Sequence, residues 1–311
     1  MAPTSATDIE ANAGTTTHAN ATANNNAPLT TANGGASEKE VSAGGANLPI
    51  VESETKKQQP SPARRSFSSR WSETVSPKHA DLICLVLCFI TGLCDSAAYN
   101  AWSCFLAMQT GNTIFLGLGA SSQPSGKPWG WLKSLLSITS FFIGSLLFSV
   151  YGRHVGPRRR STLFTSFLFQ AVLIIIAVAL LEADLIPHTE AESRSLTGGR
   201  LFLELIPIAL LAFQSAGSIT SARALGYNEI PTVVLTSVYF DVASDPKVVR
   251  DVTGNVKRNR RVGGVVMLLL GAIVGGWLSR SSGGMESALW MSAGLKGVIG
   301  IGWLGWVAEV K

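Results

Sequence analysis

Six long apolar segments lie between residues 80 and 308, and they constrain the fold more than any other feature. They occupy residues 80–101, 131–151, 161–181, 201–223, 262–279 and 286–308. A helix needs roughly 17 to 25 apolar residues to cross a bilayer, and each segment approaches or reaches that length. The composition agrees, because 46% of the residues are hydrophobic and 14% are charged, whereas soluble domains carry about 25% charged residues. The sequence therefore predicts an all-α, polytopic helical membrane protein in contact with a lipid bilayer.

Residues 1–79 differ in composition from the rest of the chain. They are rich in Ala, Thr, Asn, Gly and Ser and contain no long apolar run, which predicts a disordered tail. The tail's charges balance, so the net charge of +5 belongs to the apolar part. There the basic residues cluster between apolar segments, as expected where Lys and Arg stay cytoplasmic. We expect a cytoplasmic tail over 1–79, a transmembrane domain over 80–308 and no nucleic-acid partner; the sequence does not distinguish plasma from organellar membrane.

Two further apolar segments are short and polar. Residues 105–120 and 231–244 contain Thr, Asn, Gly or Asp and occupy matching places in the chain. Features of the two halves are separated by a nearly constant offset of 125 to 127 residues. The matching pairs are Gly92 with Gly217, Thr110 with Thr236, and Gly144 with Gly271. A fixed offset indicates duplication, with repeat one at 80–186 and repeat two at 201–308.

The path of the short segments decides how the two halves are related. If both segments are re-entrant, six helices span and the halves are inverted; if both cross, eight helices span and the halves are parallel. The basic cluster at 153–160 faces the cytoplasm only in the six-span arrangement. Fourteen residues of helix also reach only about 21 Å of a roughly 30 Å apolar layer. We therefore predict six spanning helices plus two short or re-entrant ones, in two inverted halves.

Polar residues inside the apolar segments are the candidate binding residues. Charged groups at that depth are costly and usually face a cavity or a partner, although Asp95 could also cap a kink. Gly111 permits a break, and the ends of a broken helix can coordinate an ion or a polar solute; the alternative is that the polar side chains bond only to neighbouring helices. The candidates in the first half are Asp95, Asn100, Gln109, Thr110, Gly111, Asn112 and Thr113.

The second half adds Gln214, Thr236 and Asp241, of which the last two lie in its short segment. Two short polar segments in corresponding positions indicate a binding site in transporters built from inverted repeats. Lys296 lies ten residues into the last apolar segment. Either it pairs with Asp95, or its side chain extends to the membrane surface.

Nothing in the sequence indicates catalysis, a cofactor or a metal. The chain lacks the GxxxxGK[ST], GxSxG and HExxH motifs, and its four histidines lie outside the apolar segments. Its four cysteines lack the spacing of a zinc site and fit small core residues better. We therefore expect no enzyme.

The patterns TGLCDSAAY, FLAMQTGNTIFLGLG, ALGYNEIPTVVLTSVYFDVA and RRVGGVVMLLLGAIVGGWL resemble the YoaK family of uncharacterised multi-spanning membrane proteins. The resemblance covers about residues 80–308 and implies an integral membrane protein without an assigned substrate. Ser96 and Ser237 depart from the family pattern, which has Ala and Gly there. The Asn- and Thr-rich tail is similar to an extension of a fungal member.

These features lead to two hypotheses of function. The first is a secondary transporter or channel for a small polar solute or ion, in which Asp95 attracts a cation or proton and residues of the short segments coordinate the solute. The alternative is a non-transporting membrane scaffold or sensor, whose polar residues only bind helices together. Gly271 and Gly275, spaced as GxxxG, indicate close helix packing and allow a homo-oligomer.

Overall fold

The computed structural model describes residues 70–123, 129–186, 199, 202–230, 232–248 and 253–309. Within these ranges the chain forms eight helices, and six of them are long and apolar enough to cross a membrane. The long helices are α2 (Asp81–Trp102), α4 (Gly130–Val155), α5 (Arg160–Glu182), α7 (Leu205–Ala224), α9 (Val256–Arg280) and α10 (Gly284–Gly305). The short ones are α3 (Gln109–Ala120) and α8 (Thr236–Ala243). The predicted all-α fold with six long apolar helices and two short ones is confirmed.

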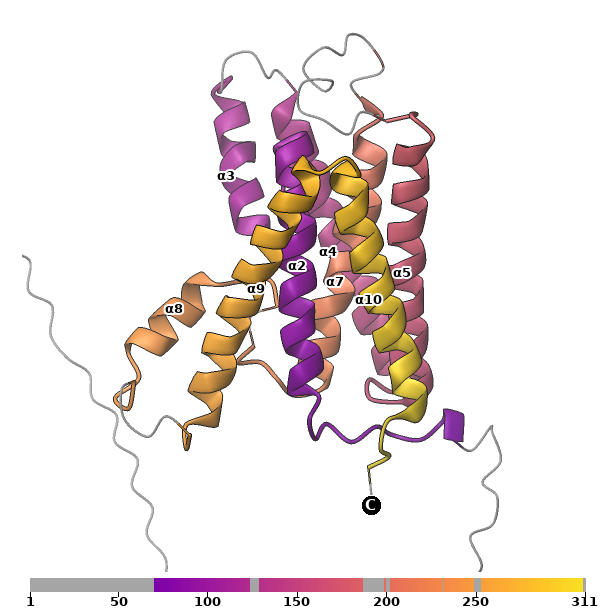
Figure 1. Ribbon diagram of the computed structural model, residues 1–311, viewed down its shortest axis with the longest axis vertical. Helices are drawn as coiled ribbons and strands as arrows, with labels where there is room; N and C mark the ends of the chain where they lie inside the picture. Colours follow the sequence, from indigo (N-terminus) through magenta and orange to yellow (C-terminus); the bar gives the residue numbers. More distant parts are fainter. Residues whose placement is uncertain are drawn as a thin grey trace, which may run out of the picture. The chain divides into compact units, whose positions relative to one another are not determined.

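The long helices share two ends, called lower and upper as in Figure 1. At the lower end, isolated bridges join Thr74 to Arg159 and Val75 to Ala308. At the upper end, Lys133 at the start of α4 forms an ion pair with Glu204 just before α7. The helices therefore run alternately up and down, and α2 starts at the lower end.

Close packing pairs the first half of the chain with the second. The largest contacts join α2 to α9, α5 to α10 and α4 to α7. A Cβ at Gly271 would lie 2.0 Å from the carbonyl oxygen of Phe89, and one at Gly144 would lie 2.5 Å from that of Phe213. Glycine is required at both positions because the facing backbones leave no room for a side chain. The close packing predicted from the GxxxG spacing is confirmed.

The short helix α3 starts inside the bundle and ends at its upper end (Figure 1). Asp95 bonds to the backbone of residues 106–108 and precedes the end of α2 by seven residues, or about 10 Å of helix. The chain thus descends after α2 and returns upward as α3, which is the path predicted for a re-entrant segment. We call residues 103–108 the re-entrant turn. Near the lower end, the buried residues Thr232 and Val233 precede α8, which leads outward beside α9.

The last ten residues of the predicted tail pack against the helices. Residues 1–69 lie outside the described residues, as does Pro231, which opened the second predicted short segment. Residues 70–79 are packed at the lower end of the bundle, where Val75 is fully buried. Trp306 donates its indole N–H to the carbonyl of Ser76, and the Tyr227 hydroxyl donates to that of Pro77. Sequence reasoning missed this because the stretch has no apolar periodicity and is held by backbone bonds.

Candidate functional site

Asp95 holds the start of the re-entrant helix. Its Oδ1 accepts hydrogen bonds from the backbone N–H groups of Leu106 and Ala107 at 2.7 and 2.9 Å, and its Oδ2 accepts one from Met108 at 3.1 Å. These three N–H groups precede α3, whose first residue is Gln109, and buried backbone N–H groups need a hydrogen-bond partner. This geometry gives Asp95 a structural task. Its role in attracting a cation or proton stays a prediction.

Asn112 and Gln109 form a second polar group beneath the re-entrant turn. The Asn112 side chain is fully buried; it accepts from the backbone N–H of Phe105 at 3.0 Å and donates to the carbonyl of Phe105 at 2.7 Å. It also donates to Gln109 Oε1 and to Ser137 on α4. These bonds attach the short segment both to itself and to α4.

The remaining candidates of the first half do not join this group. Asn100 and Thr110 are exposed, and the Thr113 hydroxyl donates to the carbonyl of Gln109 one turn earlier. A Cβ at Gly111 would meet the ring of Phe105 at 2.8 Å, so its missing side chain accommodates an aromatic contact. The short segment therefore uses only Gln109 and Asn112 in its buried network.

The candidates on α8 lie away from the centre of the bundle. Thr236 is exposed at the start of α8. Asp241 forms an ion pair with Arg261 of α9 at 3.2 Å, with its side chain 42% exposed. The two short segments thus do not meet in one site.

Lys296 on α10 lies at the centre of a polar cluster that we call the lysine cluster: Lys296, Gln170 on α5, and Gln214 and Ser218 on α7. The Lys296 ammonium donates to Gln170 Oε1 at 2.7 Å, to Ser218 Oγ at 3.0 Å and to Gln214 Oε1. Lys296 is only 1% exposed. Both predictions for Lys296 are wrong, because its amine does not bond to Asp95 and does not reach the surface.

The charge of the lysine cluster is not neutralised by a carboxylate. Three oxygen acceptors match the three N–H donors of one ammonium group, but all three belong to neutral side chains. No ion pair within the described residues includes Lys296. Buried charges are normally paired, so a protonated Lys296 would carry an uncompensated charge in the interior of the bundle.

The lysine cluster and the start of α3 are neighbours. Ser215 follows Gln214 on α7 and donates its hydroxyl to the carbonyl of Leu106 in the re-entrant turn at 3.0 Å. Cys94 precedes Asp95 on α2 and donates its thiol to Ser292 of α10 at 3.1 Å. On α7, neighbouring residues thus contact the lysine cluster and the re-entrant turn. On α2, neighbouring residues contact α10, which carries Lys296, and the same turn.

Sequence reasoning found Gln214 but missed Gln170 and Ser166. Gln170 is fully buried on α5, and its Nε2 donates to Ser166 Oγ at 3.1 Å. The signal was present, because Gln170 is a polar residue within an apolar segment. No three His, Cys, Asp or Glu side chains of the described residues are placed to hold a metal ion.

The comparison with protein families decides the classification of the chain. Residues 83–302 match the family described as Protein of unknown function (DUF1275). The chain belongs to this family. The match covers all six long helices of this DUF1275 protein, although the first and last extend slightly beyond it. Neither the comparison with curated proteins nor that with solved structures found a match.

Proposed function

We propose that this DUF1275 protein is a secondary transporter or channel for a small polar solute or ion. The observation that carries the proposal is the burial of Lys296 among three neutral acceptors where α5, α7 and α10 meet. An ionisable residue at membrane depth is costly and is typical of a solute or ion pathway. A protein that only needed stable helix packing would gain nothing from an uncompensated charge there.

The proposal includes two inverted halves, in which α2, α3, α4 and α5 correspond to α7, α8, α9 and α10. The contacts follow this correspondence, since α2 packs on α9 while α7 packs on α4. Gln170 and Lys296 are 126 residues apart, within the offset range of the repeat, and bond to each other. The lysine cluster would then lie on the pseudo-twofold axis, where transporters of this construction bind solutes.

The proposal also places the lower end and the N-terminal tail in the cytoplasm. Among the described residues, every Lys and Arg lies toward the lower end except Lys133, Arg280 and the buried Lys296. Short loops rich in Lys and Arg remain cytoplasmic. With this orientation the basic cluster at 153–160 faces the cytoplasm, as in the predicted six-span arrangement.

The experiment tests whether water-borne reagents reach the lysine cluster. Ser218→Cys would be made in the full chain, reconstituted in vesicles and treated from either side with a charged methanethiosulfonate. We expect modification faster than in the native protein, whose four cysteines are buried. A rate equal to the native one from both sides would mean a sealed cluster, and the transport proposal would be abandoned.

The second candidate is a non-transporting scaffold or sensor, which the network around Asn112 favours. The Asn112 bonds join α3 to the turn before it and to α4, as expected of polar residues that hold helices together. The two functions differ in the effect of Lys296→Met. The scaffold predicts a protein at least as stable as the native one with unchanged function, whereas the transporter predicts loss of flux.

A further inference from the structure

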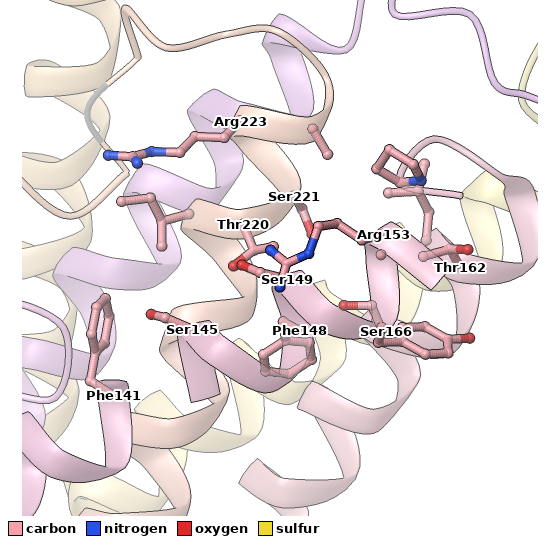
Figure 2. Close-up of a pocket in the computed structure, with 16 residues that line it drawn as sticks. Phe141, Ser145, Phe148, Ser149, Arg153, Thr162, Ser166, Thr220, Ser221 and Arg223 are labelled. Carbon is pink, nitrogen blue, oxygen red and sulfur yellow. The ribbon is translucent and has the colours of Figure 1, made fainter. Parts of the chain in front are cut away.

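A pocket of about 510 Å³ lies between α4, α5 and α7 toward the lower end (Figure 2). Pockets that hold small molecules have volumes of roughly 300 to 1,000 Å³. Phe141 and Phe148 contribute aromatic surface, and Ser145, Ser149 and Thr220 contribute hydroxyl groups. The size and the mixed lining therefore fit a small organic or inorganic solute.

The charge of this pocket has one sign. Its lining includes Arg153 and Arg223 but no Asp or Glu. Figure 2 shows the Arg153 guanidinium directed across the pocket towards Thr220 and Ser149, whereas Arg223 points away from it. Neither arginine forms an ion pair with the described residues, while the nearby Arg158 is paired with Glu309. A concave surface with cationic groups alone concentrates anions.

The pocket adjoins the lysine cluster. Ser166 lines the pocket and accepts a hydrogen bond from Gln170, which accepts one from Lys296. On α7, Ser218 of the cluster directly precedes Ile219 of the lining. One side chain therefore separates the pocket wall from the Lys296 amine, which in its protonated form adds positive potential to the pocket.

One hydroxyl group of the lining, that of Thr162, is buried without a hydrogen-bond partner among the described residues. Thr162 lines the pocket and is only 4% exposed. Its Oγ1 has no hydrogen-bond partner within the described residues. Buried hydroxyl groups are normally bonded, because an unbonded one loses its hydrogen bonds to water.

We infer that this pocket binds a small soluble oxyanion, such as a carboxylate or phosphate, and that it is the lower entrance of the solute path. Arg153 supplies the first contact, and Lys296 holds the potential that draws the anion inward. The entrance role rests on the proposed function, but anion binding can be measured without any flux. The same chemistry occurs in the phosphate of a lipid headgroup, so the test separates the two sources.

Protection of Arg153 from phenylglyoxal measures occupancy of the pocket directly. The full chain in phosphatidylcholine nanodiscs would be modified with sodium acetate, sodium phosphate, sodium chloride at equal ionic strength, or glucose, and the modified peptides counted by mass spectrometry. Acetate or phosphate should slow modification of Arg153 but not of Arg280, an exposed arginine at the opposite end. Equal rates at both arginines under all conditions would overturn the inference.

Variants test the contribution of the buried charge. Lys296→Met should raise the half-protecting concentration about tenfold, equal to about 1.4 kcal/mol of binding free energy, and Lys296→Arg should raise it less. Arg280→Gln removes the same charge far from the pocket and should leave protection unchanged. If Lys296→Met does not fold, Ser166→Ala beside the pocket serves instead and should weaken protection. Unchanged protection in the folded variant would overturn the role of the cluster.

The source of the anion is tested with nanodiscs that also contain phosphatidylglycerol. Protection by this lipid but by no soluble anion would assign the pocket to a headgroup and overturn the soluble ligand. Protection by acetate or phosphate in a protein that moves neither across vesicles would retain the site and refute transport. Flux of a neutral or cationic solute, without protection of Arg153 by any anion, would support transport and overturn the anion site.

Discussion

At the scale of single residues, the bonds of Asp95 predict a loss of stability on substitution. Asn at this position keeps one oxygen acceptor but presents an amide N–H₂ to the backbone N–H of Met108. We expect Asp95→Asn to lower the free energy of unfolding by about 1–3 kcal/mol, as loss of a buried bond to a charged group does. Thermal unfolding in detergent measures this loss.

The control for Asp95→Asn is Asp81→Asn. Asp81 forms an ion pair with Arg260 at 3.0 Å, but both side chains are partly exposed, so its loss should cost less than about 1 kcal/mol. Equal unfolding temperatures for the native protein and Asp95→Asn would contradict the assignment of Asp95 to the re-entrant turn.

Asn112 and Thr113 form a matched pair on α3. Asn112→Ala leaves the backbone N–H of Phe105 without its partner, although the Phe105 carbonyl keeps its bond from the Ser137 hydroxyl. It should cost about 1–3 kcal/mol. Thr113→Ala removes an exposed hydroxyl bonded within the helix and should change stability by less than about 0.5 kcal/mol. Both variants would be compared by thermal unfolding, and similar losses would show that the network contributes little.

The candidate residues that could be predicted are those whose polarity contrasts with an apolar segment. Asp95, Gln109, Asn112 and Gln214 were found this way. Partners could not be predicted, because they depend on the rotation of each helix and on neighbours more than 70 residues away, such as Gln214 for Lys296. The same limit explains why Lys296 was assigned to Asp95.

At the scale of helices, close backbone contact between α2 and α9 predicts a strong effect of one added methyl group. Gly271→Ala places a Cβ 2.0 Å from the carbonyl oxygen of Phe89 and should destabilise by about 1–3 kcal/mol through overpacking. Gly276→Ala lies on the same helix with no atom within 4 Å. It should be neutral or stabilising by up to about 1 kcal/mol, as the better helix former.

Unfolding in detergent distinguishes these two glycine variants. A loss at Gly271→Ala without a loss at Gly276→Ala would support the packing of α2 against α9. Equal effects would mean that helix propensity decides both, and that the close approach of the two backbones is absent in the membrane.

Helix types followed from the apolar segments, but helix ends did not. The apolar segment at 262–279 predicted a helix that starts at residue 262, whereas α9 starts at Val256. The earlier start follows from Asn255, whose side chain caps the helix by accepting from the N–H of Arg258. Asn255 in turn donates to Asp245. Asp245 accepts hydrogen bonds from the backbone N–H of Lys247 and from the Asn255 side chain, and both bonds lower its pKa. Such capping bonds extend a helix beyond its apolar part and leave no mark in hydropathy.

At the scale of the whole molecule, the distribution of charge supports the proposed orientation in the membrane. Lys133 and Arg280 are the only basic residues described toward the upper end, and Lys133 is paired with Glu204. A reversed insertion would carry the clusters at 158–160 and 257–261 across the bilayer. The charges therefore favour the orientation in which the lower end faces the cytoplasm.

Insertion of a glycosylation acceptor tests both this orientation and the re-entrant path of α3. We predict modification after Ser122, where α3 has returned to the upper end, and none after Gly156, in the basic turn at the lower end. An acceptor after Ser282 is the positive control, since six and eight spans both place it outside when the tail is cytoplasmic. Modification after Gly156 instead of Ser122 would mean that α3 crosses the bilayer in the cell. The halves would then be parallel, and Lys296 would lose its place on an axis between inverted repeats.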